Sequence, residues 1–297
     1  MRQAWSKLAG IALAGIVSVA VPAQAQTIVV GGKAFTEQQI MTAMTVAALK
    51  AKGFNPERKA GMGSAAVRSA LENGQIDVYW EYTGTGLTVF NKINDKFASA
   101  EDAYKKIKEV DGAKGIVWLN MSSVNNTYAF AMNRDEAQKR GIVTMSDYAK
   151  VVKSDPKFTF ASNAEFYARP DGLPGWQTAY GFELERDNVK RMDTGLTYTA
   201  LKDRQVDSAV VFATDGRIPA FNFVVLKDDK HYAPPYNLTP VVRKEVLDKN
   251  PKIADTLNAI SAKLNDETMA KLNASVDVDK KTPEEVAEGF LKSNGLI

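Results

Sequence analysis

The chain has 297 residues, with 38 Lys or Arg, 35 Asp or Glu, one His and no Cys. Without Cys, a disulfide scaffold, a thiol nucleophile and a cysteine zinc site are excluded, and one His makes a Ser-His-Asp triad or a His-rich metal site a poor explanation. Nearly balanced charge argues against a nucleic-acid surface, which needs a basic stripe. We therefore expect no metal, no cofactor and no nucleic-acid partner.

The first 25 residues have the features of a secretory signal peptide. Two bases and no acid accompany the apolar run LAGIALAGIVSVAV at residues 8–21, and AQA at residues 23–25 supplies a small-residue cleavage site. The run is shorter than the roughly 20 residues of a membrane span, so we expect cleavage after residue 25. Loss of the two bases lowers the formal charge from +3 to +1. In a bacterium, the mature chain is then periplasmic.

Beyond this segment, short β-branched runs alternate with helical patterns. TIVVGG at 27–32 predicts a strand, and residues 36–51 predict a helix with Thr36 as its N-cap. A second helix is expected with Ser64 as its cap and Asn73-Gly74 at its end, and the strand IDVYWEY follows at 76–82. Strands that alternate with helices predict parallel βα units and an α/β fold.

The rest of the chain continues this alternation and ends in helices. A helix is expected at 145–152 with Thr144 as N-cap, and TPEE beginning at Thr282 is a capping box with Pro at the first helical position. Apolar residues at helical spacing predict a further helix over 253–264. Further strands are predicted at residues 117–119, 128–132, 158–161, 189–192 and 206–212.

One segment has an internal counterpart. ALENGQIDVYWEYTGTG at 70–86 aligns with ALKDRQVDSAVVFATDG at 200–216, an offset of 130 residues that places Tyr82 on Phe212. This offset far exceeds the periods of solenoid repeats, which reach about 50 residues. It predicts two similar α/β lobes, each with an aromatic ring at a strand end and each forming one wall of a cleft.

Several residues near predicted strand ends are candidates for ligand contact. Ligands of open α/β sheets bind outside the carboxyl ends of strands, where Tyr82 would lie, although a single ring is more often core. Lys33 lies in a glycine turn before a helix and could bind an anion, or it could be a solvated surface residue. Three more candidates lie in turns beside predicted strands, and each could simply be part of its turn without binding a ligand: Asn126, Tyr128 and Arg169.

Six stretches together closely resemble the substrate-binding proteins of osmoprotectant ABC importers, the glycine betaine/carnitine/choline group. They are GGKAFTEQ, ALENGQIDVYWEYTGTG, NNTYAF, RPDGLPG, FATDGRI and DDKHYAPPYNLTPVV, in order along the mature chain. The resemblance implies a two-lobed α/β periplasmic-binding-protein fold of type II, with two crossover strands as the hinge. We expect lobe 1 at residues 26–130 plus 239–297 and lobe 2 at 131–238, after the signal peptide at 1–25.

The resemblance also implies a ligand site, a partner and a role. A quaternary ammonium group would lie in a box of aromatic rings, and its carboxylate would meet a Lys, an Arg and a Thr. Asn126 stands where some members have an acid, and Phe212 where Tyr is common. The protein would be a monomer that delivers its ligand to a membrane permease and would not be an enzyme. The residues carried over by motif are Lys33, Tyr82, Thr85, Asn126, Tyr128, Arg169, Phe212 and Tyr236.

The chemistry of such a ligand explains these residue types. A trimethylammonium group cannot donate a hydrogen bond, so it binds through the negative faces of rings, whereas a carboxylate suits Arg and Lys. Choline or another betaine is the alternative within the class, although two cations argue against choline. Two other classes of protein stay open: a periplasmic enzyme that uses Asp77, Glu81 or Asp215, and a permease-fused or sensor receptor.

Overall fold

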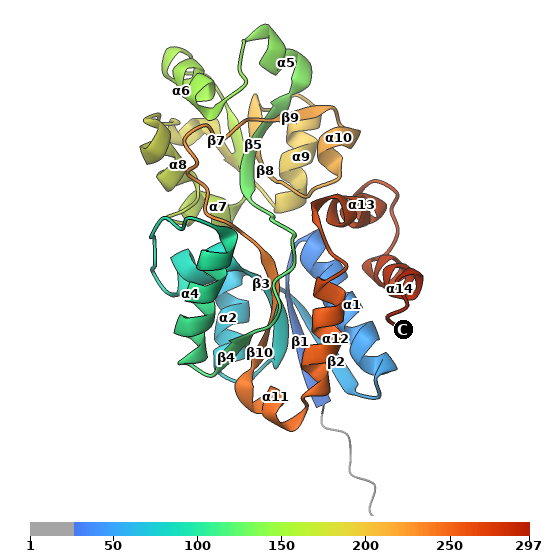
Figure 1. The fold of residues 1–297 in the computed structure, drawn as a ribbon. Coiled ribbons are helices and arrows are strands. Elements are labelled where there is room, and N and C mark those ends of the chain that lie inside the picture. The colour runs from blue at the N-terminus through green and yellow to red at the C-terminus, as the bar shows by residue number, and fades with distance from the viewer. Residues whose placement is uncertain (1–26) are drawn as a thin grey trace, which may run out of the picture.

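The computed structural model describes residues 27–297, and the expected signal peptide lies outside this range. In the described part, the strands form two five-stranded sheets, ordered β2-β1-β3-β10-β4 and β7-β6-β8-β5-β9. Each sheet is covered by helices and forms one lobe, and the two lobes are stacked end to end (Figure 1). The two-lobed α/β fold expected from the sequence is confirmed.

The first lobe contains the beginning and the end of the described chain. Its strands are β1 (Thr27–Lys33), β2 (Asn55–Met62), β3 (Val78–Tyr82), β4 (Ile116–Trp118) and β10 (Leu238–Arg243). Its helices are α1 (Thr36–Ala51), α2 (Ser64–Glu72), α3 (Thr83–Thr85), η1 (Gly86–Phe90), α4 (Ala100–Gly112), α11 (Lys244–Lys249), α12 (Lys252–Ser261), α13 (Asp266–Asp277) and α14 (Pro283–Ser293).

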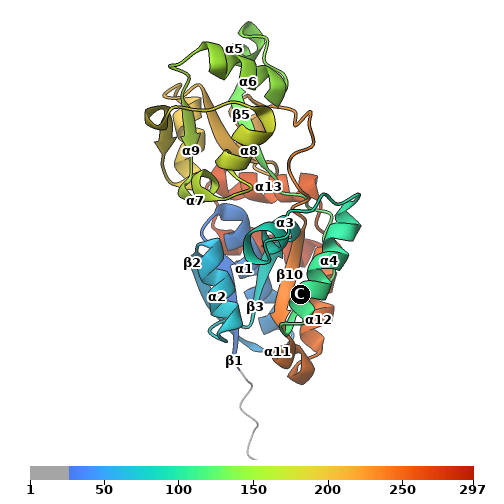
Figure 2. The ribbon, with the colours of Figure 1, turned by 90° about the vertical axis from the view of Figure 1, so that its left-hand side faces the viewer.

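The second lobe is built from one continuous middle stretch of chain. Its strands are β5 (Tyr128–Asn133), β6 (Phe160–Ser162), β7 (Val189–Arg191), β8 (Ser208–Phe212) and β9 (Phe223–Val225). Its helices are α5 (Arg134–Lys139), α6 (Met145–Ser154), α7 (Ala164–Ala168), α8 (Leu173–Tyr180), η2 (Arg186–Asn188), α9 (Thr194–Lys202) and α10 (Arg217–Ala220). Figure 2 shows α7 of this lobe and α13 of the first lobe both at the level where the two lobes meet.

Strands β3 and β8 occupy equivalent central places in the two sheets. β3 is parallel to β1 and antiparallel to β10, while β8 is parallel to β6 and antiparallel to β5. All five residues of each strand are buried, as expected for strands covered on both faces. Tyr82 and Phe212 are their last residues. The correspondence predicted from the internal similarity is therefore present in the fold.

Two segments connect the lobes, residues 119–127 before β5 and residues 226–237 before β10. They pair with each other through an isolated antiparallel bridge between Asn125 and Asn237. The division at residues 130/131 and 238/239 stays a prediction. No helix in residues 27–297 has both the length and the apolar character needed to cross a bilayer.

The predicted helices form, but two predicted caps are wrong. Ser64 was expected to cap α2, but it is the first helical residue, and the N-cap is Gly63, which has no side chain to accept a hydrogen bond. Helix α1 has Phe35 at its N-cap without a side-chain bond, and Thr36 donates its hydroxyl to Asp277 of α13 instead. The capping boxes at Thr144 and Thr282 are both present. Strand β2 was not predicted because its sequence, NPERKAGM, is polar and largely exposed at the sheet edge.

A buried ion pair anchors α4 to α2 within the first lobe. Arg68 donates to both carboxylate oxygens of Asp111 at 2.6 and 2.8 Å, and the Trp118 indole donates to the same carboxylate at 2.8 Å. Breaking a buried pair leaves an uncompensated charge, which typically costs about 3–5 kcal/mol.

We expect Asp111→Ala to lower the free energy of unfolding by about that amount in urea denaturation. The matched control is Glu72→Gln, which removes the half-exposed second partner of Arg68 and should cost less than about 1 kcal/mol. If the two changes lowered the free energy of unfolding equally, the Arg68–Asp111 pair would not stabilise the lobe more than an exposed ion pair does.

Candidate ligand-binding site

The structure brings all eight predicted site residues to one cavity between the lobes. The cavity encloses about 20 Å³, room for roughly one water molecule. Phe35 and Ser64 also line it and were not predicted. The full lining is Lys33, Phe35, Ser64, Tyr82, Thr85, Asn126, Tyr128, Arg169, Phe212 and Tyr236.

The carboxyl ends of strands supply the main walls, as expected for open α/β sheets. Lys33 ends β1, Tyr82 ends β3 and Phe212 ends β8. Asn126 and Tyr236 come from the two linking segments, so the hinge contributes to the site directly. The cavity therefore contains residues from both lobes and from the connections between them.

Five aromatic rings form a continuous wall. The centroids of Phe35 and Phe212 are 4.9 Å apart with nearly parallel planes, and Tyr128 lies 5.1 Å from Phe212. Tyr236 meets Tyr128 edge-on at 6.1 Å, and Phe35 lies 6.2 Å from Tyr82. Phe35 is the ring that sequence reasoning missed, although it lies in the GGKAFTEQ motif two residues after Lys33.

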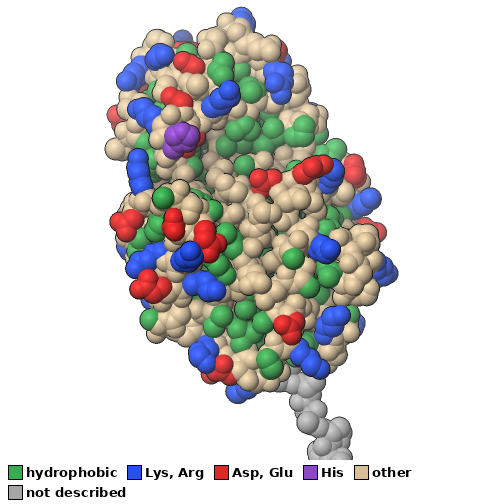
Figure 3. Space-filling view, in the orientation of Figure 1, with side chains coloured by type: hydrophobic (Ala, Val, Ile, Leu, Met, Phe, Trp, Pro, Cys, Tyr) green, Lys and Arg blue, Asp and Glu red, His purple; other side chains and the backbone are tan. Residues whose placement is uncertain are grey.

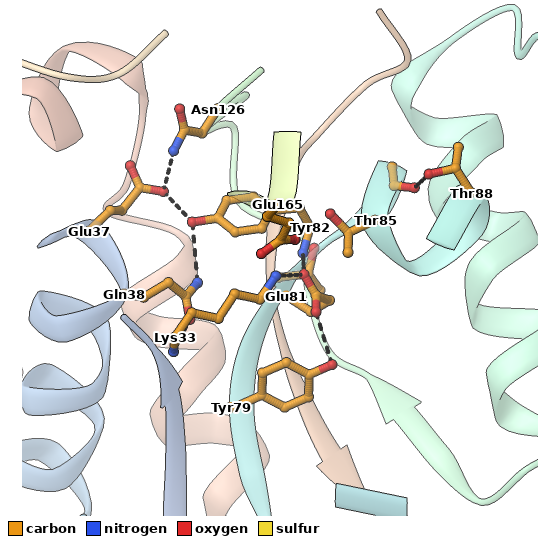
Figure 4. Close-up of polar contacts among 12 residues, drawn as sticks. Lys33, Glu37, Gln38, Tyr79, Glu81, Tyr82, Thr85, Thr88, Asn126 and Glu165 are labelled. Carbon is orange, nitrogen blue, oxygen red and sulfur yellow. Dashed lines mark hydrogen bonds and ion pairs between the residues drawn. The ribbon is translucent and has the colours of Figure 1, made fainter. Parts of the chain in front are cut away.

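Lys33 is already paired within the protein. Its ammonium nitrogen forms an ion pair with Glu81 at 2.5 Å, drawn as a dashed line in Figure 4. The same nitrogen lies 5.1 Å from the centroid of the Tyr82 ring. Glu81 also accepts from the hydroxyl of Tyr79 at 3.1 Å. The acid that we considered as a catalytic candidate thus neutralises the lysine of the site.

Arg169 follows α7 and joins the second lobe to the first. Its guanidinium donates to both oxygens of Asp171, at 2.8 and 2.6 Å, and lies 5.2 Å from the centroid of Tyr128. It also contacts the hydroxyl of Thr85 at 3.3 Å. The guanidinium of Arg169 therefore already contacts a carboxylate, the ring face of Tyr128 and the hydroxyl of Thr85.

Asp171 is the acceptor at the centre of this contact. Thr88 donates to it at 2.8 Å from the first lobe, and the hydroxyl of Tyr236 donates to the same oxygen. Burial alone would raise the pKa of Asp171, but the hydrogen bonds and charge of Arg169 lower it on balance. The carboxylate therefore stays ionised and holds both lobes and one linker together.

Glu37, in the first turn of α1, is a second buried acceptor that the sequence did not reveal. Its Oε1 accepts from the Tyr82 hydroxyl at 2.7 Å and from Asn126 at 3.1 Å (Figure 4). Its Oε2 accepts from Thr214 at 2.6 Å and from Asn273 at 3.2 Å. Burial raises its pKa, and these four hydrogen bonds only partly offset that effect.

A larger hollow of about 370 Å³ adjoins the cavity. The two share Phe35, Tyr128 and Phe212, so these rings separate the enclosed site from the outer part of the cleft. On the face drawn in Figure 3, basic and acidic side chains are interspersed and do not form a stripe of one sign. Among residues 27–297, no group of three His, Cys, Asp or Glu could hold a metal ion.

Two hinged α/β lobes that enclose a ring-lined, charged cavity define a substrate-binding protein of the periplasmic-binding-protein class. Residues 26–293 match the family model described as the substrate binding domain of ABC-type glycine betaine transport system. The chain belongs to this family.

Relatives and solved structures agree with this assignment. The chain is 44% identical to a glycine-betaine-binding protein of Pseudomonas aeruginosa, over 97% of this chain and 94% of that protein. It is 33% identical to the glycine betaine-binding protein YehZ of Escherichia coli, over 97% of this chain and 98% of that protein.

The fold is similar to that of apo YehZ from Escherichia coli, with a TM-score of 0.67 and 32% identity over 92% of this chain and all of that one. A solved structure of a glycine betaine/carnitine/choline ABC transporter protein gives a TM-score of 0.73 at 29% identity, over 91% and 99%.

The lowered pKa of Asp171 predicts how stability depends on pH. Its contribution should be fully present above the ordinary Asp pKa of about 4 and should be lost as pH falls through the lower folded value. Thermal unfolding of wild type and Asp171→Asn should therefore differ by a constant amount, on the order of 2 kcal/mol, from about pH 5 to 7. The difference should shrink only in stronger acid, and a difference that grows there would refute the ionised state.

Proposed function

We propose that this protein binds a small quaternary-ammonium compound with a carboxylate, first of all glycine betaine, and delivers it to the permease of an ABC importer. The single observation that supports this is the convergence of five rings and two cations on one cavity between hinged lobes. The signal-peptide features of residues 1–25 support export to the periplasm. We propose that it acts there as a monomer.

The five rings suit a cation that cannot donate hydrogen bonds. A desolvated ring face can stabilise such a cation by about 2 kcal/mol. Lys33 and Arg169 cover the faces of Tyr82, Tyr128 and Tyr236 in this structure. A trimethylammonium group would replace these cations on the rings, while the freed donors would turn toward the carboxylate.

Such an exchange requires the lobes to separate, because the cavity now holds about 20 Å³. Hinge closure around a ligand is a common motion of two-lobed binding proteins. Residues 119–127 and 226–237 are the connections that would bend, and Asp171 with Arg169 would break and remake contacts to the first lobe. Entry through the adjoining hollow would place the ligand against Phe35 and Phe212 first.

The relatives support a ligand with both charges. Besides the glycine betaine-binding proteins, they include a carnitine transport binding protein from Listeria monocytogenes. They also include the ergothioneine transport permease/ergothioneine binding protein EgtU from Helicobacter pylori, of which the matching part is 48%. Glycine betaine, carnitine and ergothioneine each combine a trimethylammonium group with a carboxylate. Choline lacks the carboxylate and would leave two protein cations beside a third, so we rank it below the betaines.

We also propose that the protein is not an enzyme. The three carboxylates considered as acids or bases each already have a partner within the protein. Asp77 accepts from the backbone of Val29 at 2.8 Å, and Asp215 pairs with Arg217 at 2.6 Å. Glu81 pairs with the lysine of the site. A turnover assay that gave product in excess of protein would favour an enzyme instead.

Calorimetry tests the ligand class directly. Glycine betaine, carnitine and proline betaine should each give saturable heat, and choline should bind more weakly than glycine betaine. The physical reason is that only the first three supply a carboxylate to Lys33 and Arg169. No heat from any of the three carboxylated compounds would refute the proposal.

Replacing the ring that sequence reasoning missed tests the aromatic wall. Phe35→Leu keeps an apolar side chain but removes the ring face, so glycine betaine should bind about tenfold more weakly, a loss of about 1.4 kcal/mol. Phe221→Leu is the matched control, because Phe221 packs on Phe223 in the second lobe and does not line the cavity. If the two variants bound glycine betaine equally well, the ring of Phe35 would not contribute to binding.

A further inference from the structure

The acids around the cavity differ in how their charge is compensated. Glu81 pairs with Lys33, and Asp171 pairs with Arg169. Glu37 is 2% exposed, and within residues 27–297 no Lys or Arg nitrogen lies within the 4 Å of an ion pair. Its four hydrogen-bond donors are neutral groups. Its negative charge is therefore solvated by dipoles and not cancelled by a cation.

A buried carboxylate without a counter-ion is costly, and hydrogen bonds repay only part of its lost hydration. The cost falls if a cation enters the same low-dielectric region. Glu37 is well placed for this effect because two of its donors, Tyr82 and Asn126, line the ligand cavity. A phenol that donates to a carboxylate also gains electron density in its ring, which makes the ring face more attractive to a cation.

Building on the proposed function, we infer that Glu37 is the counter-charge that makes the cavity selective for a cationic head group, the trimethylammonium of the ligand. Glu37 acts from behind the wall, through the Tyr82 hydroxyl and the Asn126 amide, and does not itself line the cavity. It is a positioning and specificity-determining residue.

The same carboxylate also joins the lobes, because Thr214 follows β8 in the second lobe. Loss of Glu37 would thus weaken closure as well as remove charge. A test must separate these two effects, and a pair of ligands with the same shape and different charge does so.

The first experiment compares glycine betaine with 3,3-dimethylbutanoate, in which carbon replaces the ammonium nitrogen. Dissociation constants are measured by ligand-observed NMR competition. We expect Glu37→Gln to weaken glycine betaine by about tenfold or more and the neutral-headed isostere by less than about threefold. Glu37→Asp, which keeps the charge, should restore most of the preference for glycine betaine.

The control variant is Thr214→Val. It removes one neutral hydrogen bond and one contact between the lobes but leaves the charge of Glu37 in place. Both ligands should therefore lose affinity by the same factor. Circular dichroism and thermal unfolding establish that each variant is folded.

A pH profile gives a second readout that does not need the isostere. Binding of a cation favours ionised Glu37, so glycine betaine affinity of the wild type should fall as pH decreases through the raised pKa of this group. In Glu37→Gln this component should be absent. The other charged or titratable groups around Glu37 remain in both proteins, so the difference isolates Glu37: they are Lys33, Tyr82, Asp215, Arg217 and Asp277.

Equal losses for the two ligands in Glu37→Gln would make Glu37 a structural residue and overturn the inference, as would unchanged glycine betaine affinity. If Glu37→Gln does not fold, or if the isostere binds neither protein, the inference is tested by the pH dependence of glycine betaine affinity in the wild-type protein. A glycine betaine affinity that stays constant down to the lowest pH at which the protein is folded overturns the inference. If the wild type binds no trimethylammonium compound, the proposed function fails first, and that result is distinct from these.

Discussion

The arrangement of the site follows from one constraint: closing two lobes over a cavity removes several charges from water, and each charge then needs a partner. Asp171 meets Arg169 from its own lobe and Thr88 from the other. Lys33 meets Glu81 at the end of its sheet. These contacts use the same groups that a zwitterionic ligand would use. The closed protein therefore satisfies its site internally, and a ligand must compete with that arrangement.

The internal similarity explains why the cavity has matching walls. β3 and β8 have five buried residues each, end in a ring and point their carboxyl ends toward the junction of the lobes. Phe212 lacks the hydroxyl that Tyr82 uses to reach Glu37. Thr214, two residues later, supplies a hydroxyl to the same carboxylate. The contact between lobes is thus made by a different residue of the same strand end.

Much of this could be predicted from the sequence, because strand ends carry local signals. Tyr82 and Phe212 were predicted at equivalent strand ends from three signals: the alternation of side chains along each strand, the glycine turns that follow, and the 130-residue offset between the two segments. Resemblance to a family completed the set of eight predicted site residues, and all eight line the cavity, whereas Phe35 and Ser64 line it without having been predicted. Their roles in binding stay a prediction.

What could not be predicted is pairing between distant segments. Glu37 has partners on β3, on a linker, in the second lobe and on α13, up to 236 residues away in sequence, and no local pattern encodes such a set. The same reason accounts for Thr36, which has the spacing of an N-cap but binds Asp277 of α13. Phe35 was missed because a single ring before a helix is more often part of a core.

The order of strands in the first sheet has a consequence for how the chain acquires its structure. β10 lies between β3 and β4, although more than a hundred residues separate it from either in sequence. The second lobe is one uninterrupted segment and can form from contacts closer in sequence. The first sheet has a gap between β3 and the edge strand β4 until residues 238–243 arrive, so one edge of β3 and the facing edge of β4 stay unpaired until then. Such edges attract other chains, so the final fifth of the polypeptide acts as its own protection against aggregation.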